Sequence, residues 1–123
     1  WLAVHPQVAR VDYPGLSESS GHAIAKNQMQ GGFGAMLAVE VRGGLAAGRR
    51  LCEALHIITR AVSLGGVESL IQHPASMSHL RTPPDVKAAL GISDGLLRLS
   101  VGIEDGADLQ ADLEVGFRAA VTG

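Results

Sequence analysis

The stretch Gly91-Ile-Ser-Asp-Gly-Leu-Leu-Arg-Leu-Ser-Val-Gly-Ile-Glu-Asp105 carries the pattern that decides the fold. Residues 96–101 alternate between apolar and polar side chains, and successive side chains of a strand point to opposite faces of a sheet. The alternation places Leu97 and Leu99 on one face and Arg98 with Ser100 on the other. The segment therefore predicts a half-buried strand that carries an arginine among apolar neighbours.

Three more strands are expected upstream of this one. They cover residues 8–13, 35–41 and 57–63, where β-branched or alternating residues stop at turn signals such as Pro14-Gly15 and Gly43-Gly44. Residues 66–81 are expected to be largely irregular.

Four helices are expected between and after these strands. They cover residues 22–29, 45–58, 83–90 and 106–121. The first is capped by Ser19 or Ser20, the third begins with the capping sequence Thr82-Pro83-Pro84-Asp85, and the last is capped by Asp105. The second and fourth helices each have one apolar stripe, which must pack on a sheet.

The order of these elements predicts the class of fold. About four strands separated by helices, with alternating rather than continuous apolar runs, favour a mainly antiparallel sheet covered by helices on one face. We therefore expect an α/β (α+β) fold and a single domain over residues 1–123.

The composition excludes several classes of partner. An apolar fraction of 46% and a balance of 10 Lys and Arg against 12 Asp and Glu argue against disorder and against a nucleic-acid-binding surface. No run approaches the ~20 apolar residues of a membrane span. The single cysteine, Cys52, requires no oxidising compartment, so a cytoplasmic location is expected.

Arg98 is the first candidate for a binding residue. A guanidinium on a half-buried strand is costly to desolvate unless a carboxylate pairs with it, and its planar fork suits the α-carboxylate of an amino acid. The alternative is an internal salt bridge to one of the chain's own acids. Ser63, at a strand end before Gly65-Gly66, could add an anion-binding corner, although a Gly-Gly pair is usually only a turn.

Other reactive residues have structural interpretations. Cys52 and His56 are one helical turn apart, but Cys52 lies on the apolar stripe and is expected to be a buried structural thiol. The spacing of His73 and His79 matches no known zinc arrangement, so no metal is expected.

The adjacent carboxylates Glu104 and Asp105 are also expected to be structural, because neighbours in sequence rarely face a common substrate.

The segment Ala61-Val-Ser-Leu-Gly-Gly-Val-Glu-Ser-Leu-Ile-Gln-His-Pro-Ala-Ser-Met-Ser-His79 resembles the cystathionine and methionine metabolism (transsulfuration) family of pyridoxal-phosphate enzymes. The 91–105 stretch, His5-Pro6 and Val11-Asp-Tyr-Pro-Gly-Leu16 extend the resemblance over nearly the whole chain in family order. The resemblance implies the small C-terminal domain of the aspartate-aminotransferase-like fold type I.

The resemblance also implies roles for four residues. Arg98 matches the arginine that grips the substrate α-carboxylate, and Ser63 matches the serine that helps to hold this group. Ser78 stands where relatives commonly have a threonine near the cofactor. Val62 replaces a glutamate that is common in relatives acting on cystathionine. Since valine cannot pair with a distant ammonium, an O-succinylhomoserine sulfhydrylase-like enzyme is favoured, with methionine γ-lyase or a cystathionine γ-synthase or lyase as alternatives.

The cofactor lysine is missing from this chain. The only lysines, Lys26 and Lys87, lie on helices expected to be exposed and outside the family's lysine motif. We expect Trp1 to be a boundary within a longer protein, pyridoxal phosphate to be bound by an absent large domain, and the chain alone to be inactive.

The resemblance further implies an amino-acid substrate and a homo-oligomeric parent, a dimer of dimers. Two alternatives of another class stay open at this point: a non-catalytic amino-acid-binding module and an assembly module.

Overall fold

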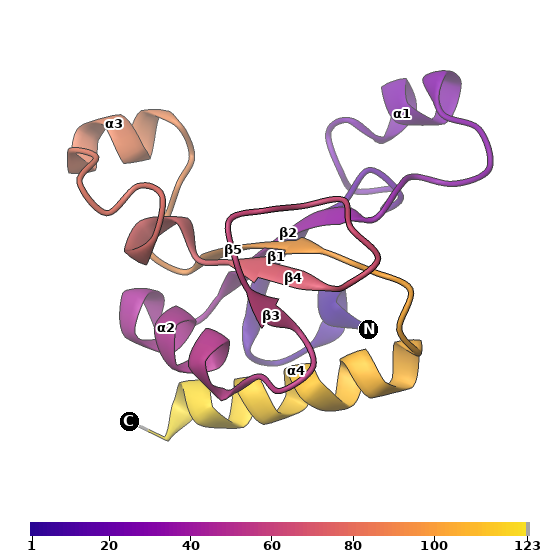
Figure 1. Cartoon of the computed structure of the whole chain (residues 1–123). Coiled ribbons are helices and arrows are strands. Elements are labelled where there is room, and N and C mark those ends of the chain that lie inside the picture. Colours follow the sequence, from indigo (N-terminus) through magenta and orange to yellow (C-terminus); the bar gives the residue numbers. More distant parts are fainter. Residues whose placement is uncertain (123) are drawn as a thin grey trace.

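The computed structural model describes residues 1–122, and its centre is a five-stranded mixed sheet with the order β1-β2-β5-β4-β3 (Figure 1). The strands are β1 (Val8–Asp12), β2 (Met36–Val41), β3 (Thr59–Arg60), β4 (Leu70–Gln72) and β5 (Leu96–Ser100). All neighbouring pairs are antiparallel except β3 and β4, which are parallel. The arginine-bearing strand β5 is therefore the central strand.

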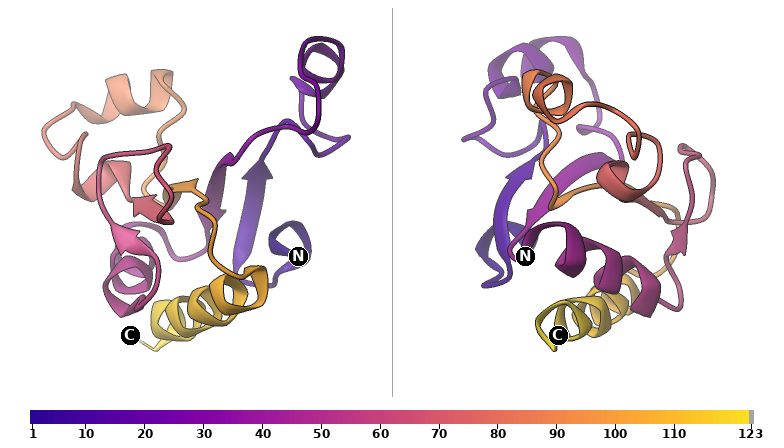
Figure 2. Two further views of the ribbon diagram at one scale, coloured as in Figure 1. Left: turned by 45° about the vertical axis from the view of Figure 1, so that its right-hand side comes forward. Right: turned by 90° about the vertical axis from the view of Figure 1, so that its left-hand side faces the viewer.

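Two of the helices cover one face of the sheet, and the other two lie away from it in loops that connect the ends of its strands (Figures 1 and 2). The helices are α1 (His22–Gln28), α2 (Gly44–Ala54), α3 (Pro84–Ala89) and α4 (Gly106–Val121), with short 3-10 turns η1 (Leu2–Val4) and η2 (Pro74–Ser76). Helices α2 and α4 bury apolar side chains, whereas α1 and α3 bury none. The prediction of helices on one face holds for the two helices that pack on the sheet.

The alternation along β5 separates the core from the opposite face. Leu97 is 2% exposed and pairs in register with Val39 of β2. Leu99 is 4% exposed and pairs with Ile71 of β4. Cross-strand partners share a face, so this face packs against α2 and α4. The core consists of Val8, Val39, Val41, Ala47, Leu51, Cys52, Ile58, Ile71, Leu97, Leu99, Leu109, Leu113, Phe117 and Ala120. The opposite face carries Arg98 and Ser100.

One of the five strands was missed in the sequence. Strand β4 lies inside residues 66–81, which were predicted to be irregular. It is only three residues long and buried on both faces, so it shows no alternation. The strand predicted over residues 57–63 is also shorter, since only Thr59–Arg60 pair with β4.

Two predicted helix caps were also wrong. The N-cap position of α1 is Gly21 rather than Ser19 or Ser20, and that of α3 is Pro83 rather than Thr82; neither helix has a side-chain cap. Helix α1 begins one residue further from the serines than a serine cap requires, and α3 begins at Pro84, which has no N–H to donate to a cap. The cap predicted for the last helix is confirmed, because the Asp105 carboxylate accepts hydrogen bonds from the N–H groups of the first turn of α4. Helix α2 ends at Ala54, before the predicted end at residue 58.

Candidate carboxylate-binding site

The guanidinium of Arg98 is anchored to the loop that follows β3. Its Nη2 donates to the backbone carbonyl oxygens of Val62 and Ser63, both at 2.8 Å. The central position of β5 fixes the backbone of Arg98 on both sides, since Ala38 and Gln72 pair with it in register. The structure thus brings together three of the residues predicted for the site.

The remaining donors of Arg98 are not used by any acid among residues 1–122. A guanidinium has five N–H donors, and the buried Nε has no hydrogen-bond partner among residues 1–122. None of the ion pairs formed within these residues includes Arg98. The alternative of an internal salt bridge is therefore not what the structure shows. A buried donor without an acceptor is rare and calls for a ligand or a solvent partner.

The loop that carries Ser63 turns sharply at Gly65. Gly65 has φ +77°, a left-handed conformation that glycine adopts without the steric cost of a Cβ. Its N–H donates to the Ser100 hydroxyl at 2.8 Å, so the turn is held by the strand that also carries Arg98. The side chain of Ser63 is exposed next to this turn. The Gly65-Gly66 pair is thus a turn in this structure.

Val62 contributes an exposed apolar side chain at the rim of the site. Its side chain is 62% exposed, while its carbonyl oxygen is held by Arg98. Position 62 therefore brings a backbone acceptor and no charged group to this part of the chain.

Ser78 is hydrogen-bonded to Gln72, the β4 residue that is the register partner of Arg98. Gln72 is paired in register with Arg98, so the two side chains share a face of the sheet. The Gln72 amide Nε2 donates to the Ser78 hydroxyl at 2.5 Å, and the same hydroxyl lies 2.8 Å from His79 Nδ1. These contacts place the fourth predicted residue close to the same face.

The sequence analysis missed two polar residues that organise this face, Gln72 and Ser100. Ser100 is 1% exposed and was placed correctly on the polar face of the strand, but it was given no role. Its spacing of two from Arg98 was the signal, because alternate residues of a strand share a face. Gln72 gave no such signal, since its strand was not predicted.

Cys52 has the structural role that was expected. The thiol is 5% exposed, and desolvation by burial raises its pKa to about 12. His56 is exposed, and its backbone N–H is bound to Asp112. A thiol held in its neutral form is a poor nucleophile.

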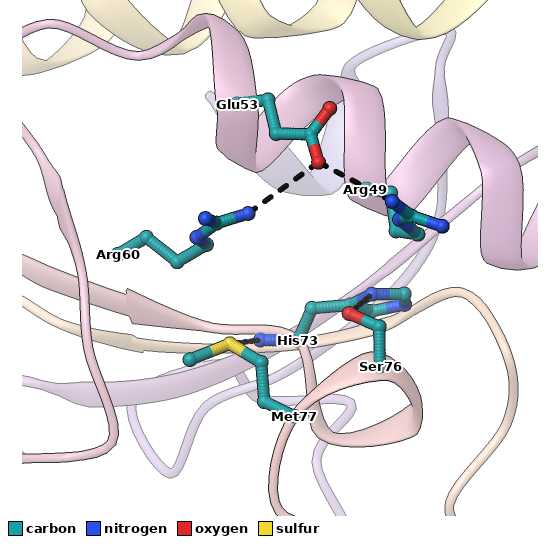
Figure 3. Close-up of polar contacts among 6 residues, drawn as sticks. All are labelled: Arg49, Glu53, Arg60, His73, Ser76 and Met77. Atoms are coloured by element: carbon teal, nitrogen blue, oxygen red, sulfur yellow. Dashed lines mark hydrogen bonds and ion pairs between the residues drawn. The ribbon is translucent and has the colours of Figure 1, made fainter. Parts of the chain in front are cut away.

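His73 is a buried structural histidine (Figure 3). Its ring Nδ1 lies 2.8 Å from the Ser76 hydroxyl, and its ring Nε2 lies 2.8 Å from the Asp94 carbonyl oxygen. Its backbone N–H donates to the sulfur of Met77. The residues that the structure describes contain no group of three or more His, Cys, Asp or Glu side chains arranged to hold a metal ion. Figure 3 also shows Glu53 between two arginines, Arg49 and Arg60, at 3.6 and 3.5 Å.

The carboxylates Glu104 and Asp105 are structural, as predicted. Glu104 accepts hydrogen bonds from both the backbone N–H and the hydroxyl of Ser69, at 2.6 and 2.8 Å. The bond from the N–H, followed by the one from the hydroxyl, lowers the pKa of Glu104. This pair fixes the start of β4 beside the end of β5.

Neither lysine suits covalent attachment of an aldehyde cofactor. Lys26 is exposed on α1. Lys87, which was predicted to be exposed, is only 18% exposed and pairs with Asp94 at 3.3 Å. Schiff-base lysines are activated by desolvation or by a neighbouring cation, and an ion pair with a carboxylate supplies neither. The cofactor that the sequence resemblance implies does not fit these two side chains.

The fold and the site define a class of protein. A solved structure of cystathionine gamma synthase from Xanthomonas oryzae pv. oryzae in complex with cystathionine matches 97% of the chain with a TM-score of 0.85 and 51% sequence identity. A structure of cystathionine gamma-lyase from Lactobacillus plantarum complexed with L-serine matches the same share with a TM-score of 0.86 and 45% identity. The fold is that of the small domain of fold type I pyridoxal-phosphate enzymes.

The chain belongs to the Cys/Met metabolism PLP-dependent enzyme family, whose model matches residues 1–118. Among its relatives, cystathionine gamma-synthase of Escherichia coli (strain K12) is 53% identical over all 123 residues, and L-methionine gamma-lyase of Pseudomonas putida is 49% identical over 120 residues, or 98% of the chain. The family confirms the resemblance found in the sequence.

The chain spans about a third of the length of these relatives. It covers 32% of the E. coli enzyme, 30% of the P. putida enzyme, and 30% and 31% of the two solved chains. None of the helices within residues 1–122 is both long and apolar enough to cross a membrane.

Proposed function

We propose that this chain is the substrate-binding part of a pyridoxal-phosphate-dependent transsulfuration enzyme, and that Arg98 and Ser63 bind the α-carboxylate of the amino-acid substrate. The observation that carries this proposal is the state of Arg98. Its guanidinium is anchored by two carbonyl oxygens, has no acidic partner among residues 1–122, and keeps a buried Nε without an acceptor. A carboxylate ligand would supply the acceptor that this donor lacks.

The contribution of the chain to the reaction would be orientation. Two parallel N–H···O bonds from a guanidinium fix a carboxylate in a plane, and the hydroxyl or N–H of Ser63 would add a further contact. Holding the reactant in one orientation can supply a large part of a rate enhancement. Because neither Lys26 nor Lys87 suits the cofactor, pyridoxal phosphate would be held by a part of the longer protein outside this chain. Ser78 would lie on the side of the site that faces the cofactor.

The substrate would be an amino acid with a γ-substituent. The exposed, uncharged Val62 at the rim offers no partner to a distal ammonium, so we favour γ-replacement on an O-acylhomoserine, as in an O-succinylhomoserine sulfhydrylase. Methionine γ-lyase is the second candidate, supported by the same apolar side chain and by the identity to the P. putida enzyme. For the longer protein, a dimer of dimers in the cytoplasm stays a prediction.

The test is substitution of Arg98 in the longer protein. The Arg98→Ala variant should lose about thirtyfold or more in kcat/KM, because removing one partner of a buried charge pair costs about 2–5 kcal/mol. Arg118→Ala is the matched control, because Arg118 is an exposed arginine on α4, which packs on the other face of the sheet. An unchanged kcat/KM in Arg98→Ala would refute the proposal.

A second measurement separates this function from a free-standing binding module. Calorimetry of the 123-residue chain with methionine or an O-acylhomoserine should show no saturable binding, because half of the site is missing. Saturable binding without cofactor would favour the module instead.

A further inference from the structure

We propose that Ser100 is a positioning residue of the carboxylate site, and that it holds the Ser63 loop in place through the N–H of Gly65. This inference rests on the proposed function of Arg98 and Ser63. Ser100 and Arg98 are two residues apart on β5 and point to the same face of the sheet. Both contact the same loop, Arg98 at the carbonyls of residues 62 and 63 and Ser100 at the N–H of residue 65.

The position of Ser100 is fixed by strand pairing on both sides. It lies on the central strand, where Met36 and Leu70 pair with it in register on either side. Its side chain is 1% exposed, and its Oγ is 2.8 Å from the Gly65 nitrogen. The acceptor therefore has a fixed place relative to the Arg98 guanidinium.

Other backbone hydrogen bonds hold the two ends of this loop, one from the N–H of Ala61 and one to the carbonyl oxygen of Val67. Between these ends, Val62 is 62% exposed and Leu64 is 53% exposed, so neither side chain anchors the loop by apolar burial. The polypeptide from residue 61 to residue 69 belongs to no helix or strand. The contacts made by β5 therefore hold the middle of the loop, where Ser63 lies.

The two contacts use different groups of the site. The carbonyl oxygens of Val62 and Ser63 accept from Nη2 of Arg98, which leaves the other nitrogens of the guanidinium to donate to a carboxylate. The bond from Gly65 to Ser100 uses no donor of the guanidinium, so it would persist when a carboxylate binds. Ser100 would thus keep Ser63 in register before and after binding, which pre-organises the site for the carboxylate.

The first test is amide hydrogen exchange at Gly65, measured by NMR on the 123-residue chain. Ser100→Ala removes only the acceptor and fits the same space, and exchange of the Gly65 N–H should accelerate about tenfold or more. Ser93→Ala is the matched control, because the Ser93 hydroxyl is also buried but has no hydrogen-bond partner among residues 1–122. This control should leave the exchange of Gly65 unchanged.

The second test is steady-state kinetics of the longer enzyme. Ser100→Ala should raise KM for the amino-acid substrate about tenfold and change kcat by less than about twofold, since loss of uniform binding raises KM alone. Ser93→Ala should change neither. Unchanged Gly65 exchange or an unchanged KM in Ser100→Ala would overturn the inference. An Arg98→Ala variant with full kcat/KM would instead refute the proposed function, so the two failures can be told apart.

Discussion

The carboxylate of Asp112, on α4, accepts a hydrogen bond from the backbone N–H of Ile58 at 2.8 Å. The same carboxylate also accepts the N–H groups of His56 and Ile57, at 2.8 and 3.0 Å. Asp112 is 4% exposed, and its buried carboxyl oxygens are satisfied by three backbone donors. This contact fixes the chain between α2 and β3, just before the loop that carries Ser63.

Removal of this carboxylate should destabilise the fold. We expect Asp112→Ala to lower the free energy of unfolding by about 3 kcal/mol, because buried backbone donors would be left without an acceptor. Urea unfolding followed by circular dichroism measures the change. Asp108→Ala, an exposed acid in the first turn of the same helix, should cost at most about 1 kcal/mol. Equal losses in the two variants would contradict the role assigned to Asp112.

A glutamate at position 62 should change substrate preference in the longer enzyme. In Val62→Glu an exposed carboxylate would lie beside the proposed site, where it attracts a distal ammonium and repels a distal carboxylate. We expect kcat/KM for cystathionine, relative to O-succinylhomoserine, to rise about two- to fivefold, which is the range of an exposed ion pair. Val62→Gln has nearly the same size without the charge and should leave the ratio unchanged. A ratio that does not move in Val62→Glu would place position 62 outside the specificity site.

Glu104 should make the fold sensitive to acid. Its hydrogen bonds from Ser69 hold its pKa in the folded protein below the ordinary value of 4.5. Its stabilising contribution is therefore fully present above pH 4.5 and is lost as the pH falls through the lower folded value. Glu104→Gln should thus lose less stability than the wild type between neutral pH and about pH 3.5, as measured by urea midpoints at the two pH values. Glu68→Gln, which removes an exposed carboxyl outside this network, should keep the wild-type difference.

Gly48 should not tolerate a side chain. A Cβ on Gly48 would lie 2.7 Å from the Nε2 atom of His73, whose ring is fully buried and bonded at both nitrogens. We expect Gly48→Ala to lower the free energy of unfolding by about 1–3 kcal/mol, because the core must shift to accept the methyl group. In contrast, a Cβ on Gly106 meets nothing within 4 Å, so Gly106→Ala should be neutral or stabilise α4 by up to about 1 kcal/mol. Thermal unfolding of the two variants gives the comparison, and an unaffected Gly48→Ala would show that His73 can move.

Most of the secondary structure could be predicted because local signals agree with the tertiary packing. The alternation in residues 96–101 predicted the central strand, and the apolar stripe of the last helix predicted its buried side, with Leu109, Leu113 and Phe117 all in the core. Val121, the last residue of α4, is 54% exposed. The errors fall where the signal is short or unspecific, as in the three-residue β4 and at the caps of α1 and α3.

In the candidate site, the residues could be predicted from the sequence, but their contacts could not. Arg98, Ser63, Val62 and Ser78 could be named from the sequence, because a charged residue on an apolar strand and a family pattern are both local features of the chain. That Arg98 has no acidic partner among residues 1–122 was not predictable, since an ion pair joins residues distant in sequence. Nor were the contacts of Ser100 with Gly65 and of Gln72 with Ser78.

The amino-acid order by itself determined the four helices and four of the five strands, which face of β5 is polar, and to which family the chain belongs. Only the tertiary structure decided that β5 lies at the centre of the sheet, that its arginine is bound to backbone carbonyls rather than to an acid, and that Lys87 is paired with Asp94. The physical reason is the distance along the chain over which each interaction acts. Periodicity and turn propensity act over a few residues, whereas hydrogen-bond partners are chosen by the packing of segments that lie far apart along the chain.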